Sequence, residues 1–339
     1  MFERTIWWEA DEAVVIDQTK LPHDATTVRW RMMEDAARGI TAMEVRGAPL
    51  IGVAAAYGMA LAMREDPSDL DGAVKTLAAT RPTAVNLQWA LDRMRAALDP
   101  IDIAERAAHA RRLSEEATEA DVAACRAIGE AGLPLIAQAH EHLGRAVNVL
   151  THCNAGWLAC VEWGTATAPV YLAHEAGLPV HVWVSETRPR NQGAALTAWE
   201  LGHRDVPHTL IVDNAAGHLL GSGQVDLVIT GADRIAANGD AANKIGTYLK
   251  AVAARDRGVP FAIAAPTSTF DPACPSGDRI PIEERDADEV LVFAGTPISP
   301  AGTTARNWGF DVTPARLVDH YITDRGLLTA DDLSPVLGR

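Results

Sequence analysis

The 339-residue chain has few cysteines and no long apolar run. Its four cysteines, Cys125, Cys153, Cys160 and Cys274, include no CxxC pair, which argues against a disulfide framework or a zinc knuckle and suits a reducing cytoplasm. No segment reaches 18 uncharged apolar residues, so we expect no membrane span. The first dozen residues carry acids where a signal peptide needs a basic region and a long apolar core. We therefore expect a cytoplasmic protein.

Positive charge is also scarce. The sequence holds 30 Lys and Arg against 45 Asp and Glu, for a formal net charge of −15. A nucleic-acid-binding surface would show a basic stripe, so we expect no nucleic-acid partner. A local basic pocket for a small anion is compatible with this average, because net charge describes the whole surface.

The length and the 48% hydrophobic content predict two globular domains. Residues 1–145 begin with three short β-prone segments, expected to form a small antiparallel sheet, and continue from residue 33 with helical spacing of apolar residues. Residues 146–339 alternate apolar strand candidates with helix-length segments, the pattern of βαβ units. The expected fold class is α/β, with a Rossmann-like, doubly wound, mostly parallel sheet in the second domain.

Polar side chains collect where the predicted strands end. The strand candidates are residues 147–151, 180–184, 209–212, 225–230, 261–265 and 290–293. In an open α/β sheet, ligands bind in the crevice beyond the carboxyl ends of the strands. The segment 231–248 follows one such strand with carboxylates, amides, a lysine and glycines, which makes Asp233, Asn243 and Lys244 candidate site residues.

Two of these strand ends offer groups for acid–base chemistry. Cys153 lies at a predicted strand-to-helix turn, where backbone N–H groups of a following helix lower a thiol pKa. The alternative is a buried cysteine that serves as a small apolar filler. Asp233 could act as an acid or base if burial raises its pKa, or could simply cap the helix expected after it.

Arg46 and Arg81 stand in similar settings. Each precedes a proline, Pro49 or Pro82, that is suited to the first turn of a helix. A guanidinium beside free N–H groups at a helix N-terminus makes a good phosphate site. Each motif alone could be an ordinary capped helix with a solvated arginine; the pair favours an anion pocket between the domains.

Several long segments together resemble the 5-methylthioribose-1-phosphate isomerase family of methionine salvage, which shares its fold with regulatory subunits of the eukaryotic translation-initiation exchange factor. The matching segments are Arg46 to Gly58, Arg81 to Leu87, Thr151 to Gly156, Glu186 to Arg190 with Gln192 and Gly193, Gly231 to Tyr248, Ala264 to Thr269 and Ile280 to Arg285. They extend over nearly the whole chain.

The resemblance implies an aldose–ketose isomerase that converts 5-methylthio-D-ribose 1-phosphate to 5-methylthio-D-ribulose 1-phosphate, acts as a homodimer and uses no cofactor or metal. Its catalytic pair falls on Cys153 and Asp233. Its substrate contacts fall on Arg46, Gly47, Ala48, Arg81, Gln192, Asn243 and Lys244. Reasoning from the residues alone had not singled out Gln192 from the other residues of its loop.

The sequence departs from the family pattern at three positions expected to border the pocket: Trp157, Ser185 and Asn191. These departures leave fine substrate preference open, including 5-deoxyribose 1-phosphate and ribose 1,5-bisphosphate as alternatives. A non-catalytic regulatory subunit is the other alternative. Retention of both Cys153 and Asp233 argues against it.

Overall fold

The computed structural model describes residues 4–82 and 84–337. The chain opens with a three-stranded antiparallel sheet of strands β1 (Ile6–Glu9), β2 (Glu12–Ile16) and β3 (Thr27–Trp30). Its inner face buries Ile6, Val15 and Trp30 in the core of the N-terminal half. The predicted small antiparallel sheet is therefore confirmed.

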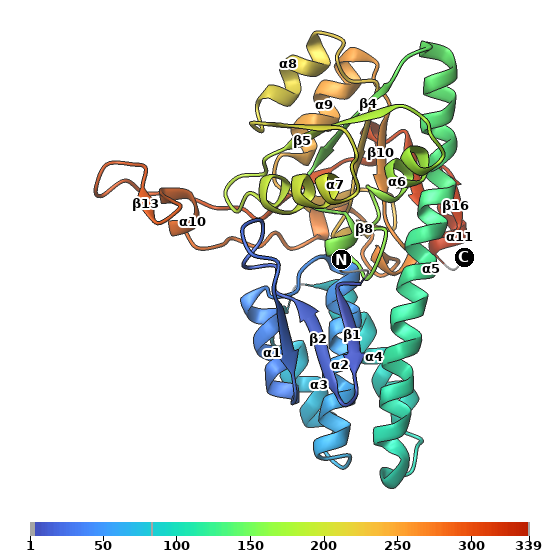
Figure 1. The fold of residues 1–339 in the computed structure, drawn as a ribbon, viewed down its shortest axis with the longest axis vertical. Helices are drawn as coiled ribbons and strands as arrows, with labels where there is room; N and C mark the ends of the chain where they lie inside the picture. The colour runs from blue at the N-terminus through green and yellow to red at the C-terminus, as the bar shows by residue number, and fades with distance from the viewer. Residues whose placement is uncertain (1–3, 83, 338–339) are drawn as a thin grey trace.

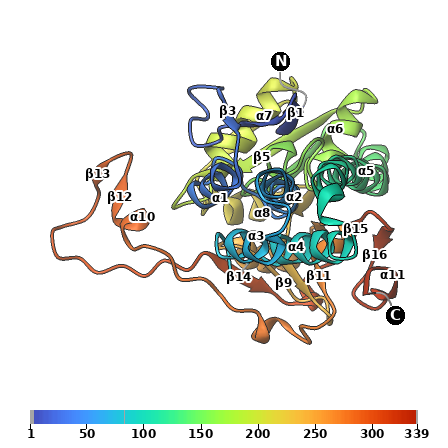
Figure 2. The ribbon, with the colours of Figure 1, turned by 90° about the horizontal axis from the view of Figure 1, so that it is seen from below.

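Helices then follow as predicted. They are α1 (Met33–Ala42), α2 (Ala48–Glu65), α3 (Leu70–Ala78), α4 (Val85–Leu98) and α5 (Ile103–Leu143). Every residue of α2 from Leu50 to Met63 is buried, because its alanines, glycines and aliphatic side chains make the helix apolar on all sides. In the view from below, α2 lies between α1 and α5, with α3 and α4 along one side of the row (Figure 2).

Helix α5 runs along both halves of the molecule (Figure 1). Its 41 residues bury Ala110 in the N-terminal core and Ile128 and Ile136 in the core of the large sheet. The turn after α5 contains residue 145, where we placed the domain boundary. Because α5 contributes to both cores, the division into two domains stays a prediction.

The C-terminal half is built on a seven-stranded sheet with the order β16-β15-β10-β7-β4-β5-β6. All pairs are parallel except the one between β15 and β16, which confirms the predicted Rossmann-like sheet. The strands are β4 (Val147–His152), β5 (Val180–Ser185), β6 (His208–Ile211), β7 (Leu227–Thr230), β10 (Phe261–Ala264), β15 (His320–Thr323) and β16 (Gly326–Leu328). The chain winds outward from β4 in one direction and from β7 in the other, so the strand order reverses between these two strands.

Shorter helices connect the strands. They are α6 (Ala168–Glu175), α7 (Ala198–His203), α8 (Ala215–Gly221), α9 (Thr247–Arg257) and α11 (Ser334–Leu337), the 3-10 helices η1 (Trp157–Ala159), η3 (Thr267–Thr269), η4 (Gly277–Arg279) and η5 (Ala315–Leu317), and the π-helix η2 (Gly193–Thr197). Within the described ranges, no helix combines the length and the apolar character needed to cross a membrane.

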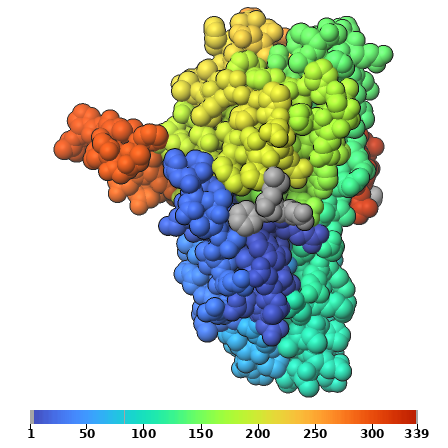
Figure 3. All heavy atoms as spheres, in the orientation of Figure 1, coloured from blue at the N-terminus to red at the C-terminus, as the bar shows by residue number. Residues whose placement is uncertain are grey.

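One predicted strand of the large sheet is wrong. Residues 290–293 do not join it but form the end of α10 (Asp288–Leu291) and strand β12 (Val292–Phe293), which pairs with β13 (Thr296–Pro297). This hairpin belongs to an arm that stands clear of the body (Figures 1 and 3). The strand that lies next to β10 in the sheet is β15 instead. Its Tyr321 and Ile322 are fully buried, whereas Phe293 is 45% exposed.

A second sheet covers the region that follows β7. It has the order β11-β8-β9-β14 and consists of β8 (Arg234–Ala236), β9 (Ala241–Lys244), β11 (Phe270–Asp271) and β14 (Phe310–Thr313). Sequence analysis missed this sheet, because its strands have two to four residues and are polar at several positions. It holds the polar segment after β7 against the carboxyl end of the parallel strands.

Candidate active site

A cavity opens where the carboxyl ends of β4 and β7 meet the start of α2. Its lining includes all nine predicted site residues: Arg46, Gly47, Ala48, Arg81, Cys153, Gln192, Asp233, Asn243 and Lys244. They come from segments almost 200 positions apart in the sequence. The fold thus brings together every site residue that we predicted from the sequence. They lie at the edge of the sheet where the strand order predicts a ligand crevice.

Cys153 follows directly on β4 in an unusual backbone conformation. Its φ of 64° lies in the left-handed region, which non-glycine residues seldom adopt. Two threonines hold it there: the Cys153 N–H donates to Thr187 Oγ1 at 2.8 Å, and the Cys153 carbonyl accepts from Thr197 Oγ1 at 2.6 Å. These hydrogen bonds fix the backbone that carries the thiol at the cavity, where Cys153 is 8% exposed.

The expected lowering of the Cys153 pKa is wrong. No α-helix follows Cys153 directly; the next helical element is η1, a single turn of three residues. Burial raises the thiol pKa above its ordinary value, and the nearby charges of Arg46 and Lys244 offset this only in part. The free protein therefore presents Cys153 as a thiol at neutral pH.

Asp233 faces the same cavity from the end of β7. The interpretation as a helix cap is wrong, because strands β8 and β9 follow it and α9 begins only at Thr247. The Asp233 N–H donates to the Ala242 carbonyl at 2.9 Å, which ties the turn to β9. Burial raises the pKa of the carboxyl group, against the lowering effects of Lys244, Arg46 and Arg81. This is the shift that an acid–base role requires.

Arg46 and Arg81 both line the cavity but differ in their hydrogen bonding. Arg46 is held by Asn154: Nη1 donates to Asn154 Oδ1 at 2.5 Å and Nη2 to the Asn154 carbonyl at 2.9 Å. The guanidinium of Arg81, by contrast, has no hydrogen bond or ion pair with any described residue, and burial lowers its pKa. A largely buried cation that makes no hydrogen bond or close ion pair with a described residue is suited to receive an anionic group of a ligand.

The helix starts beside these arginines differ from each other. Gly47 has a φ of 98° and α2 begins at Ala48, with Pro49 in its first turn as predicted. Gly47 is required here because an added Cβ would lie 2.5 Å from Cα of Ala159. Helix α4 begins only at Val85, so Pro82 precedes its first turn and the second motif is not the copy that we expected.

The remaining predicted contacts also line the cavity. Lys244 places Nζ 4.4 Å from the centroid of the Phe310 ring, and burial lowers its pKa. Asn243 Nδ2 donates to Thr247 Oγ1 at 2.9 Å. The buried Oε1 of Gln192 has no hydrogen-bond partner among the described residues. Gln192 and Arg81 thus leave polar groups unsatisfied at the cavity, as expected where a polar ligand completes the site.

Comparison with known proteins agrees with this geometry. The model of the initiation factor 2 subunit family matches residues 44–330. The methylthioribose-1-phosphate isomerase of Methylorubrum populi is 57% identical over 97% of this chain and 94% of the relative, and that of Rhodospirillum centenum is 55% identical over 96% and 91%. The chain belongs to the methylthioribose-1-phosphate isomerase family.

Solved structures related to the methylthioribose-1-phosphate isomerase family share the whole fold. The 5-methylthioribose 1-phosphate isomerase of Pyrococcus horikoshii superposes with a TM-score of 0.89 at 39% identity, covering 99% of this chain and 96% of that one. The translation initiation factor eIF-2B subunit delta of A. fulgidus gives a TM-score of 0.87 at 40% identity over the full length of both chains.

The three departures from the pattern of the methylthioribose-1-phosphate isomerase family lie outside the cavity lining, contrary to our expectation that they border the pocket. Trp157 is buried and packs near Trp199, with ring centroids 5.9 Å apart. Ser185 donates from Oγ to Asp213 Oδ1 at 2.5 Å, and Asn191 adopts a φ of 57°. These three residues can therefore affect the pocket only through the residues that support its lining.

Sequence analysis assigned no role to several residues that line the cavity, among them Arg190 and Arg285. Both bind the Glu289 carboxylate, Arg190 through Nη1 and Arg285 through Nη2, each at 2.9 Å. Their segments were among those that carry the resemblance, which was the available signal. Their convergence depends on the long connection that carries the arm, and no local pattern predicts it.

Proposed function

We propose that the chain is an aldose–ketose isomerase that converts 5-methylthio-D-ribose 1-phosphate to 5-methylthio-D-ribulose 1-phosphate. The relatives that are 54–57% identical over nearly the full chain carry this activity in their names. The observation that carries the proposal is the pairing of an acid, Asp233, with a thiol, Cys153, in a cavity that also holds the Arg81 guanidinium, for which no described residue is a hydrogen-bond partner.

The substrate explains why an acid is needed. Its anomeric oxygen carries the phosphate, so the sugar ring cannot open spontaneously to a free aldehyde. We assign Asp233 as the general acid that protonates the ring oxygen while the bond between that oxygen and C1 breaks. Burial raises the pKa of this carboxyl group, which favours the protonated form that this step consumes.

Two routes then move hydrogen from C2 to C1. In the first, Cys153 gives up its thiol proton to solvent as the substrate binds; the thiolate then takes the C2 proton, an enediol forms, the proton returns to C1 and the O2 proton returns to Asp233. In the second, hydride moves directly from C2 to C1, the O2 proton passes to the Asp233 carboxylate, and Cys153 stabilises charge. Reaction in deuterated water separates them, because only the first route places solvent deuterium at C1.

We assign the phosphate to Arg81 and Arg46. Arg81 supplies charge-assisted hydrogen bonds from a guanidinium with no protein partner among the described residues, and Arg46 stands at the start of α2 beside Gly47 and Ala48. Gln192, Asn243 and Lys244 would contact the sugar hydroxyls and the methylthio-bearing end. The reaction uses no cofactor in this scheme.

We further propose that the protein is a cytoplasmic homodimer. The arm exposes Phe293 at 45% and Ile298 at 59%, apolar area that a second copy would cover. Sedimentation of the purified protein at several concentrations tests the dimer. A Phe293→Ser variant should shift the protein toward the monomer.

A substrate panel tests the proposed activity. Purified protein is mixed with 5-methylthioribose 1-phosphate, 5-deoxyribose 1-phosphate or ribose 1,5-bisphosphate, and the ketose phosphate is detected by NMR. Preferential turnover of the first supports the proposal, and preference for another sugar assigns a sister isomerase. The full-length match to the initiation factor subunit makes a non-catalytic regulatory protein the second candidate, and lack of product with all three sugars would favour it.

A further inference from the structure

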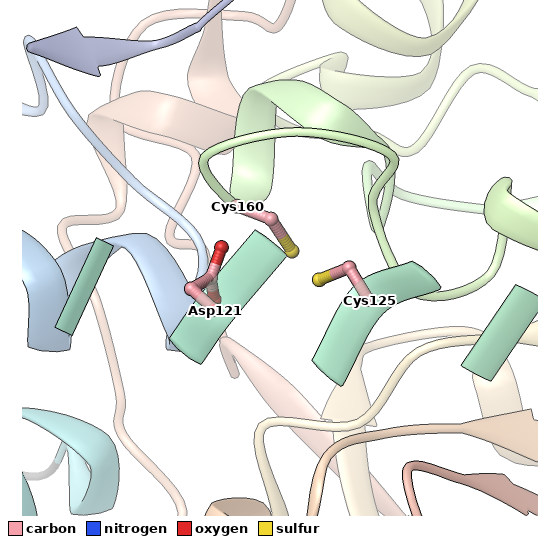
Figure 4. Close-up of side chains that lie close together, drawn as sticks. All are labelled: Asp121, Cys125 and Cys160. Carbon is pink, nitrogen blue, oxygen red and sulfur yellow. The ribbon is translucent and has the colours of Figure 1, made fainter. Parts of the chain in front are cut away.

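Three potential metal ligands converge beside the cavity, and one of them, Cys160, also lines it. Asp121 and Cys125 lie on α5, and Cys160 follows η1. One carboxylate oxygen of Asp121 and the sulfur atoms of Cys125 and Cys160 all lie within 4.8 Å of one another. The close-up shows the three side chains pointing toward a common space (Figure 4).

The cluster is held in place by its surroundings. Asp121 and Cys125 are four residues apart on α5, so they share one face of a regular helix. The Asp121 carboxylate accepts a hydrogen bond from the Val161 N–H to Oδ2 at 2.7 Å, which orients the group and leaves Oδ1 available. The Cys160 carbonyl accepts from Thr5 Oγ1 at 2.5 Å, and its N–H donates to the Trp157 carbonyl at 3.0 Å.

The cluster also lacks a cation. Among the described residues, no lysine, arginine or histidine forms an ion pair with Asp121. Both thiols are free and fully buried, and the one hydrogen bond that the described residues donate to the Asp121 carboxylate comes from the Val161 N–H. Three acidic groups are thus packed together with only protons to neutralise them. A divalent cation would take the place of these protons and bind all three anions at once.

The donor atoms select the kind of cation. Two sulfur atoms and one oxygen suit zinc and similar thiophilic ions, whereas magnesium and calcium prefer oxygen ligands alone. Zinc–ligand distances of about 2.0–2.3 Å place ligand atoms roughly 3.5–3.8 Å apart around a tetrahedral ion. Small side-chain rotations therefore suffice, and the fourth position would take a water molecule.

We propose that Asp121, Cys125 and Cys160 form a binding site for a thiophilic divalent cation of the zinc class, separate from the isomerase chemistry. Binding would join α5 to the segment after η1. Because Ala159, against which Gly47 packs, ends η1 and directly precedes Cys160, an occupied site would also brace the start of α2.

Titration with Co²⁺ and Cd²⁺ tests the site in the full-length protein after reduction and chelator treatment. We expect one equivalent to bind per chain, with thiolate-to-metal charge-transfer absorption and a higher midpoint of thermal unfolding. Cys125→Ser and Asp121→Asn should each weaken binding at least tenfold. Cys274→Ser is the matched control, because it removes another buried thiol from a different core cluster and should leave binding unchanged.

Three results would overturn the proposal. One is the lack of charge-transfer absorption in the wild-type protein, and another is binding that survives in Cys125→Ser but disappears in Cys153→Ala, which would place the metal at the active-site thiol. The third concerns protein purified without reductant. It is a thiol count on the denatured protein that finds two free thiols instead of four, with reduction restoring the other two. If Cys125→Ser fails to fold, Cys125→Ala and Asp121→Asn give the same comparison.

Discussion

Arg46 donates a 2.5 Å hydrogen bond to Oδ1 of Asn154, the residue next to Cys153. Through this contact the helical half of the chain positions the turn that carries the thiol. Arg46 therefore has a structural partner as well as a proposed ligand, whereas Arg81 has no partner among the described residues. The two arginines should respond differently to substitution.

Arg81→Ala should mainly raise KM. The lost charge-assisted bonds to phosphate correspond to ~1.5–3 kcal/mol of binding. The midpoint of thermal unfolding should stay nearly unchanged, because the side chain makes no ion pair with the part of the chain that the structure describes. Steady-state kinetics and calorimetry measure the two effects. Arg112→Ala, at an exposed position on α5, is the matched control; an unaltered KM in Arg81→Ala would remove this residue from the phosphate site.

Arg46→Ala should lower kcat as well as raise KM. It removes a proposed phosphate contact and also frees Asn154 from the two hydrogen bonds that fix the turn beside Cys153. The kinetic constants, measured beside those of Arg81→Ala, separate the two roles. Equal changes in both variants would argue that the contact with Asn154 has no influence on catalysis.

Alkylation of Cys153 should depend steeply on pH. Because burial raises the thiol pKa above its ordinary value of 9.0, little thiolate is present at pH 7, and the reaction with iodoacetamide should accelerate as the pH rises through and beyond 9. Mass spectrometry of the modified peptide measures the rate, and substrate should slow it. Fast modification at pH 7 with no further rise would show that the thiol is already ionised.

Gly47→Ala should damage both stability and activity, because the new Cβ meets Cα of Ala159 at 2.5 Å and φ is positive. Gly177→Ala is the matched control: its φ is also positive, but nothing lies within 4 Å of an added Cβ. The control should lose only the ~1–2 kcal/mol of a left-handed alanine in the free energy of unfolding. Urea unfolding measures both variants, and equal losses would mean that the contact with Ala159 relaxes easily.

Glu200→Gln should reduce the pH dependence of stability. Glu200 is fully buried, and burial raises its pKa from 4.5 to about 7. A carboxyl group with a raised folded-state pKa stabilises the fold below pH 4.5, and this contribution is lost as pH rises through 7. The unfolding midpoint of the wild type should therefore fall more between pH 5 and pH 8 than that of the variant. Parallel curves would show that Glu200 does not titrate in this range.

The sequence predicted the parts of this site that depend on local pattern. Cys153 and Asp233 could be placed because each follows a short apolar run that reads as a buried parallel strand, and such strands end at one edge of a sheet. The hairpin of β8 and β9 could not be predicted, since strands of three and four residues have little periodicity. The raised pKa of Cys153 was missed for a related reason: it depends on how deeply the folded chain buries the thiol, which one segment does not reveal.

The most direct test of the central claim is kcat for Cys153→Ser and Asp233→Asn in one assay of ketose phosphate formation. Serine keeps the shape but replaces the thiol with a hydroxyl that is far harder to ionise, and asparagine keeps the outline of the carboxyl group without its transferable proton. Each variant should lose roughly 10²-fold or more in kcat while it still binds substrate, and the double variant should lose less than the product of the two single losses. Turnover of Cys153→Ser at a rate near that of the wild type would contradict the account and make the thiol a packing residue.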